Sequence, residues 1–121
     1  MRIEITLPIK IKSELNIREH WSVRHKRHKK LHKLIWLSFL PHKASISLPC
    51  VVTLTRVSSR ALDDDNLIGA FKTIRDYVAD QIIPGLKMGR ADGDPRITWK
   101  YEQRKGLPKE YACCILIEDT K

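Results

Sequence analysis

Three segments of alternating apolar and polar residues and one segment rich in β-branched residues predict four β-strands. Between residues 3 and 11 every second residue is Ile or Leu, which indicates a strand with one buried face. Pro8 lacks a backbone donor, so we expect this strand at a sheet edge or bent there. The segment 50–57 is rich in β-branched residues and predicts a second strand. Two further alternating runs, 96–104 and 110–118, flank a Lys-Gly-Leu-Pro turn and are expected to pair as a hairpin.

Capping residues predict one helix, and apolar positions spaced three to four residues apart predict another. The first is expected to begin at Asn16, with Glu19 completing a capping box, and to end near Leu40. Its last part, residues 34–40, is almost wholly apolar and is expected to be buried. The second helix follows an acidic segment and ends before Pro84, with an apolar stripe formed by Leu67, Ala70, Phe71, Ile74, Tyr77, Val78 and Ile82.

The order strand, helix, strand, helix, strand, strand predicts one α+β domain. A chain of 121 residues is the size of a single compact domain, so residues 1–121 are treated as one unit. We expect a mixed β-sheet with the two main helices packed over one face.

The net charge of +9, with a pI of about 9.7, favours a polyanionic partner. Charge alone does not separate a nucleic acid from an anionic membrane surface. The chain has no apolar run long enough to span a bilayer and no secretory signal, so we expect no membrane partner. Its three cysteines, Cys50, Cys113 and Cys114, are odd in number and include an adjacent pair, which favours a reducing compartment, the cytoplasm.

The acidic segment Asp63-Asp64-Asp65 is the candidate metal site. If this segment is extended, the carboxylates of Asp63 and Asp65 point the same way and can bind Mg²⁺, a hard cation that takes oxygen ligands. Such an ion polarises a phosphoryl oxygen and lowers the pKa of a bound water. We prefer Asp94 as the third carboxylate, with Asp92 as its close rival. In the alternative interpretation, Asp64 or Asp65 only caps the helix and the other acids form a solvated turn.

A polar stripe on the second helix extends this candidate site. At about 100° per residue, Asp65, Gly69, Lys72 and Asp76 lie along one side of the helix, opposite the apolar stripe. Lys72 can contact the scissile phosphate or stabilise charge on the leaving group. A Lys at such a position is also an ordinary surface residue.

The segment from Leu62 to Leu67, at the start of an amphipathic helix, resembles the signature of RusA-type Holliday-junction resolvases. Their pattern is Asp-x-Asp-Asn-Leu, followed downstream by a further Asp before a strand, and the loop at 92–94 occupies that place here. This resemblance implies a RusA-like fold and a homodimer, of a kind common in phages and prophages. It further implies cleavage of branched DNA with Mg²⁺ or Mn²⁺, without a small-molecule cofactor. It assigns Asp63, Asp65 and Asp94 as the metal-binding acids. One departure is Gly69, where the family usually has lysine; Lys72 is the candidate replacement.

The segment 18–33 carries seven Lys or Arg and one acid, which makes it the candidate DNA-contacting surface. These cations cannot all face one way on a helix, and they are Arg18, Arg24, Lys26, Arg27, Lys29, Lys30 and Lys33. His28 and His32 have the spacing of a helical zinc site, but the surrounding cations oppose metal binding. Trp21 is either a stacking residue or a partly buried anchor.

The sequence therefore favours a metal-dependent endonuclease that hydrolyses phosphodiester bonds in branched DNA. A second hypothesis is a non-catalytic nucleic-acid-binding module with a degenerate site, which the glycine at position 69 keeps open. A third is a domain whose basic helix binds an acidic protein.

Overall fold

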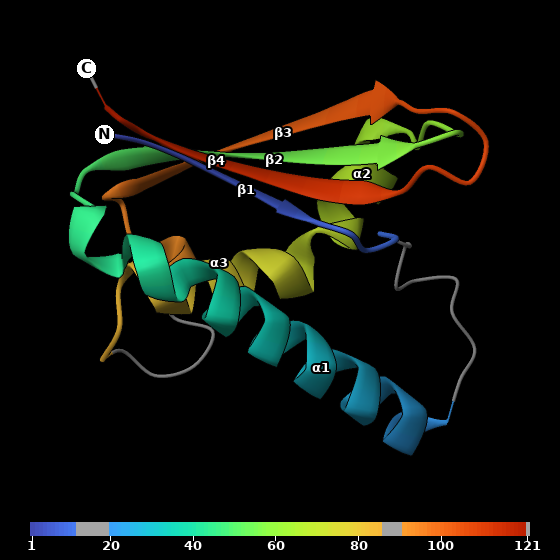
Figure 1. Ribbon diagram of the computed structural model, residues 1–121, viewed down its shortest axis with the longest axis horizontal. Helices are drawn as coiled ribbons and strands as arrows, with labels where there is room; N and C mark the ends of the chain where they lie inside the picture. Colours follow the sequence, from blue (N-terminus) through green and yellow to red (C-terminus); the bar gives the residue numbers. More distant parts are fainter. Residues whose placement is uncertain (12–19, 86–90, 121) are drawn as a thin grey trace.

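A four-stranded mixed sheet forms the framework of the computed structural model, which describes residues 1–11, 20–85 and 91–120 (Figure 1). Its strands lie in the order β1-β4-β2-β3. β2 and β3 are parallel, whereas β4 is antiparallel to both β1 and β2. The bounds are Arg2–Leu7 for β1, Cys50–Ser58 for β2, Ile97–Lys105 for β3 and Ala112–Asp119 for β4.

The helices α1 and α3 lie against one face of this sheet, which confirms the predicted α+β class (Figure 1). The helical elements are α1 Trp21–Phe39, the 3₁₀ helix η2 Leu40–Ser45, α2 Asp64–Ala70, α3 Lys72–Ile82 and the 3₁₀ turn η3 Ala91–Gly93. Between the sheet and these helices lies a core that includes Ile35, Phe39, Leu54 and Phe71, all fully buried. The core thus joins residues from both helices and the central strand.

The predicted hairpin of the last two strands is wrong. β4 pairs with β1 and β2, and β3 pairs with β2 on its other side, so β2 separates the two strands that follow each other in sequence. β2 is buried along almost its whole length, and a central position covers both of its edges. β3 alternates between buried and exposed residues as far as Gln103, which suits an edge strand.

Two expectations about the first half of the chain have different outcomes. β1 lies at a sheet edge, as predicted, but it ends at Leu7, directly before Pro8, and does not continue to Ile11. The predicted helix start at Asn16 and Glu19 lies outside the described residues. The helix that the structure shows begins at Trp21, and the ring of His20 caps it by accepting a hydrogen bond from the backbone N–H of Ser22.

Only part of the apolar segment 34–40 is buried, contrary to the prediction. Ile35 and Phe39 have no exposed surface, whereas Trp36, Leu37 and Leu40 are 42%, 46% and 46% exposed. The segment covers almost two helical turns, so its side chains point in all directions while the sheet covers one side. The uncovered residues form an apolar patch at the C-terminal end of α1.

The second predicted helix is divided into α2 and α3 at Phe71. The N–H of Phe71 lies 3.3 Å from the carbonyl oxygen of Leu67 and 3.2 Å from that of Ile68, as in a tightened turn. Phe71 itself is fully buried, and Gly69 precedes it. The packing of this aromatic ring and the low helix propensity of glycine account for the break.

Candidate functional site

The acidic segment before α2 is held by β3. The side-chain amide of Gln103 accepts a hydrogen bond from the N–H of Leu62 at 2.9 Å and donates one to its carbonyl oxygen at 2.7 Å. Asp63 is the N-cap of α2, and its carboxylate accepts from the N–H of Asn66 at 2.9 Å. Asp65 lies in the first turn and is exposed. Asp63 therefore has the capping role that the alternative interpretation gave to Asp64 or Asp65.

Asp92 lies in η3 and is fixed against α3 and β3. Its carbonyl oxygen accepts hydrogen bonds from Arg75 Nη2 and from Trp99 Nε1, both at 3.0 Å. Arg75 Nε lies 3.5 Å from a carboxylate oxygen of Asp92, and its guanidinium carbon lies 4.9 Å from the centre of the Trp99 ring. These contacts place the half-buried Asp92 carboxylate beside the helix.

Asp76 and Asp92 form a pair of carboxyl groups. Asp76, on α3, is partly buried, and this burial together with the charge and hydrogen bond of Asp92 raises its pKa to about 6, while Lys72 opposes the shift. The expected proximity of Lys72 and Asp76 on one helix face is thereby confirmed. Two carboxylates this close repel each other once both are ionised, unless a proton or a cation lies between them. The pair thus fits a divalent ion with hard oxygen ligands.

Asp94 has a different environment, because Arg96 neutralises it. Its carboxylate accepts hydrogen bonds from Arg96 Nε at 3.0 Å, from Nη2 at 2.9 Å and from the backbone N–H at 2.9 Å. These bonds lower the pKa of Asp94 to about 2. The arrangement closes the turn that leads into β3 and already satisfies both carboxylate oxygens.

The structure does not bring the predicted ligands into one group. Leu62 contacts Gln103 on β3, whereas Asp92 contacts Trp99 on the same strand. Gln103 and Trp99 are four residues apart, which corresponds to about 13 Å along the strand. Within residues 1–11, 20–85 and 91–120, no three His, Cys, Asp or Glu side chains gather closely enough to hold a metal ion. The roles of Asp63, Asp65 and Asp94 as metal ligands stay predictions.

The break at Phe71 also changes the polar stripe of the predicted helix. Gly69 belongs to α2, whereas Lys72 and Asp76 belong to α3, so a single helical rotation no longer relates them. A Cβ at Gly69 would have no heavy atom within 4 Å. Packing therefore does not require glycine in place of the family lysine, and Lys72 is the cation that the structure puts beside the Asp76 carboxyl group.

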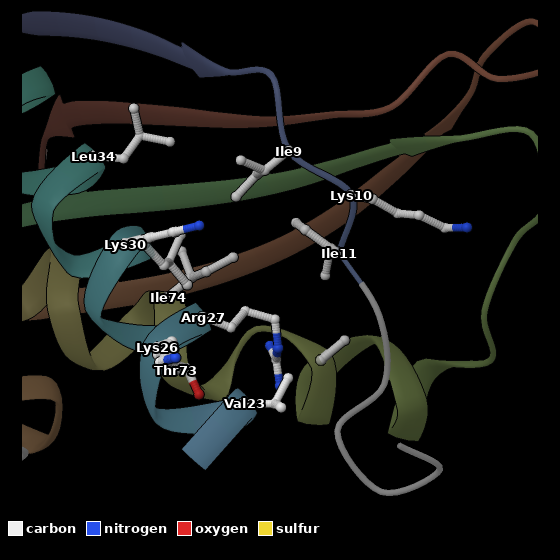
Figure 2. A pocket seen from close by; sticks show the side chains of 12 residues that line it. Ile9, Lys10, Ile11, Val23, Lys26, Arg27, Lys30, Leu34, Thr73 and Ile74 are labelled. Carbon is white, nitrogen blue, oxygen red and sulfur yellow. The ribbon is translucent and has the colours of Figure 1, made fainter. Parts of the chain in front are cut away.

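A cavity of about 500 Å³ lies between α1, the segment after β1, and the start of α3 (Figure 2). Lys26, Arg27 and Lys30 line it from α1, and Lys10 lines it from the segment after β1 (Figure 2). Its apolar part is formed by Ile9, Ile11, Val23, Leu31, Leu34, Ala70 and Ile74. The cavity therefore combines an apolar wall with four cations.

The predicted DNA-contacting cations are divided among different parts of the α1 surface. Three of them line the cavity, whereas Arg24, Lys29 and Lys33 do not, as expected for a set that cannot share one helix face. Arg18 lies outside the described residues. Trp21, at the start of the helix, is 74% exposed and is not the partly buried anchor of one sequence interpretation. His32 packs edge-on against Tyr77, with ring centres 4.8 Å apart.

Sequence reasoning missed Arg75, which organises the carboxylate pair. Besides its contacts with Asp92 and Trp99, Arg75 donates a hydrogen bond to the Tyr101 hydroxyl at 2.6 Å. The sequence feature that could have indicated Arg75 is its position directly after Ile74, at the border of the apolar stripe of α3. A cation there must find partners within the fold, because leaving a charge buried without one is costly.

Comparison with protein-family models and with curated proteins finds no match to this chain. Across the part of the chain that the structure describes, no helix combines the length and the apolar composition needed to cross a membrane.

Proposed function

We propose that this protein is a Mg²⁺- or Mn²⁺-dependent endonuclease that hydrolyses phosphodiester bonds in branched DNA, like the RusA-type resolvases that its acidic segment resembles. The observation that carries the proposal is the Asp76–Asp92 pair, whose mutual repulsion a divalent cation would relieve. The net charge of +9 supports a polyanionic substrate. RusA-likeness of the fold and dimerisation are parts of the same proposal.

In this proposal the two carboxylates hold the ion and Lys72 binds the phosphate beside it. When bound, the ion polarises a phosphoryl oxygen and lowers the pKa of a water ligand. Asp92 is preferred to Asp94 as a ligand, because Arg96 donates three hydrogen bonds to the Asp94 carboxylate, whereas Arg75 only forms an ion pair of 3.5 Å with the Asp92 carboxylate. Lys72 is exposed and close to Asp76, so it can reach a phosphate at that site. The cations of α1 bind the DNA backbone.

Cleavage of a synthetic four-way junction with Mg²⁺ tests the proposal. Asp76→Asn and Asp92→Asn are expected to lower the cleavage rate by about 100-fold or more, since each removes an ion ligand worth several kcal/mol of charge stabilisation. Glu102→Gln, an exposed acid on β3, is the matched control and should retain full activity. Linear duplex serves as the substrate control.

The same assay ranks the other acids. Asp65→Asn should abolish cleavage if the acidic segment supplies ligands, and Asp94→Asn should leave cleavage within about threefold if Arg96 occupies that carboxylate. Undiminished cleavage by both Asp76→Asn and Asp92→Asn would reject the carboxylate pair as the site.

A non-catalytic nucleic-acid-binding module is the second candidate. Its supporting observations are the capping role of Asp63 and the lack of any group of three metal-binding side chains within the described residues. Titration with Mn²⁺ separates the two candidates. DNA binding without detectable ion binding or cleavage would favour the module.

A further inference from the structure

A second cavity, of about 370 Å³, lies where β2 and β3 end and the chain turns toward α2. Four cations line it, together with two serine side chains and no acid, and we call it the basic pocket. Its charged and hydroxyl residues are Arg56, Ser58, Ser59, Arg60, Arg104 and Lys105. It shares no residue with the cavity beside α1. The chain therefore has two separate concave surfaces rich in positive charge.

Arg56 is a buried charge without a carboxylate partner among the described residues. It is 6% exposed, and its guanidinium donates to the carbonyl oxygen of Ile11 at 3.1 Å and to that of Arg60 through Nη1. Burial lowers its pKa from the ordinary value, and the charge interaction with Tyr111 opposes that shift. Buried charges in proteins are usually neutralised by an opposite charge, so an anion from outside the described chain fits here.

The backbone around the basic pocket is firmly held. Ser58 and Lys105 are paired in the parallel register of β2 and β3, and the N–H of Gly106 donates to the carbonyl oxygen of Ser58 at 2.9 Å. Gln103 binds both backbone groups of Leu62, which fixes the far end of the segment that carries Arg60. Such a frame can present several cations to one anion without large rearrangement.

We propose that the basic pocket binds a phosphate group, with the guanidinium groups of Arg56, Arg60 and Arg104 as its principal ligands. Guanidinium groups donate paired hydrogen bonds that match phosphate oxygens, and the serine hydroxyls and Lys105 add further donors. Asp63 follows Arg60 by three residues, so a bound strand would pass beside the acidic segment. The identification of a nucleic-acid strand as the source of the phosphate rests on the proposed function.

Inorganic phosphate binding to the full chain tests the pocket directly. Phosphate should raise the unfolding temperature by a few degrees more than chloride does at equal ionic strength. The variant with both Arg60→Gln and Arg104→Gln should lose this effect, whereas Lys100→Gln, which removes the same kind of charge from an exposed position on β3, should retain it. An equal response of wild type and the double variant would overturn the proposal.

The two substituted arginines are exposed, so the double variant is expected to fold. Far-UV circular dichroism and the unfolding temperature without phosphate check this. If the double variant does not fold, Arg104→Gln alone replaces it, with about tenfold weaker phosphate binding expected for the loss of one charge-assisted hydrogen bond.

Labelled single strands with a 5′-hydroxyl or a 5′-phosphate distinguish the sources of the phosphate. If the pocket binds an internal phosphodiester, both strands should bind with equal affinity. The slope of log affinity against log salt should then decrease by about 1 for each phosphate contact removed. A terminal phosphate predicts tighter binding of the phosphorylated strand by wild type and not by the double variant. Unchanged affinity and slope in the double variant, for both strands, would exclude the pocket as a nucleic-acid contact.

These measurements need neither Mg²⁺ nor cleavage, so they separate the two proposals. Phosphate binding that depends on Arg60 and Arg104 in a protein that cuts no DNA would retain the pocket and reject the nuclease. Cleavage that is unaffected by the double substitution, in a protein that binds no phosphate, would retain the nuclease and reject the pocket.

Discussion

Two aspartates, Asp94 in the turn before β3 and Asp76 on α3, show how surroundings decide the chemistry of one residue type. Asp94 accepts three hydrogen bonds from Arg96, and its pKa falls to about 2. Asp76 is partly buried beside Asp92, and its pKa rises to about 6. The first carboxylate is stable as an anion, whereas the second gains or loses its proton near pH 6.

The raised pKa of Asp76 predicts that the free energy of unfolding falls as the pH rises from about 4 to about 6. The unfolded chain loses this proton near the ordinary value of 3.8 and the folded chain near 6, so the unfolded state binds fewer protons in that interval. Asp76→Asn removes this effect. After allowance for solvent screening, the variant should be more stable than wild type by about 1 kcal/mol above pH 6 and no more stable at pH 4.

Urea denaturation in EDTA, followed by circular dichroism at both pH values, measures this difference. Adding Mg²⁺ above pH 6 should stabilise wild type and not the variant, because only wild type retains both ligands. Glu102→Gln is the control for the loss of one surface acid. A stability difference between wild type and Asp76→Asn that is the same at both pH values would contradict the raised pKa of Asp76.

At the scale of elements, α1 presents different surfaces to different neighbours. Ile35 and Phe39 pack into the core, Lys26 and Lys30 face the cavity, and Trp36 is exposed near the C-terminal end. A helix whose hydrophobic residues lie on several sides cannot bury all of them on one sheet. The uncovered parts are therefore available for partners.

The cavity-lining cations of α1 predict a salt-dependent contact with DNA. Lys26→Gln together with Lys30→Gln should weaken junction binding and reduce the slope of log affinity against log salt by about 2, since each contact contributes about 0.9. Fluorescence anisotropy from about 50 to 200 mM salt measures the slope. Lys43→Gln with Lys109→Gln removes two exposed cations elsewhere and should leave it unchanged. Equal slopes for the two double variants would place the DNA contact on another surface.

At the scale of the whole molecule, the predicted homodimer needs an apolar contact surface. Trp36, Leu37 and Leu40 form an exposed apolar patch at the end of α1, of the kind that marks interfaces. We expect wild type to be a dimer at micromolar concentration and the variant Trp36→Glu with Leu40→Glu to be a monomer. Sedimentation equilibrium measures both, with Leu107→Glu as a control at an exposed leucine in the turn before β4. A monomeric wild type would reject the dimer, and a dimeric variant would exclude this patch.

The local features of the fold could be predicted from sequence because they depend on neighbours in the chain. Alternation located β1, β3 and β4 to within a few residues, β-branched composition located β2, and Pro8 indicated the edge position of β1. The pairing of β3 with β2 could not be predicted, because strand order depends on which strands must be hydrogen-bonded along both edges once the whole sheet has formed. The division at Phe71 likewise follows from the packing of one ring in the core.

For the candidate site, sequence indicated the chemistry and not the arrangement. It determined a strongly basic chain with two acidic segments, because residue type and spacing are properties of the chain itself. Only the tertiary structure placed Asp76 against Asp92, occupied Asp94 with Arg96 and buried Arg56 among basic neighbours. The reason is physical: the charge that a side chain carries, and what it can bind, depends on groups that folding brings near it from distant positions.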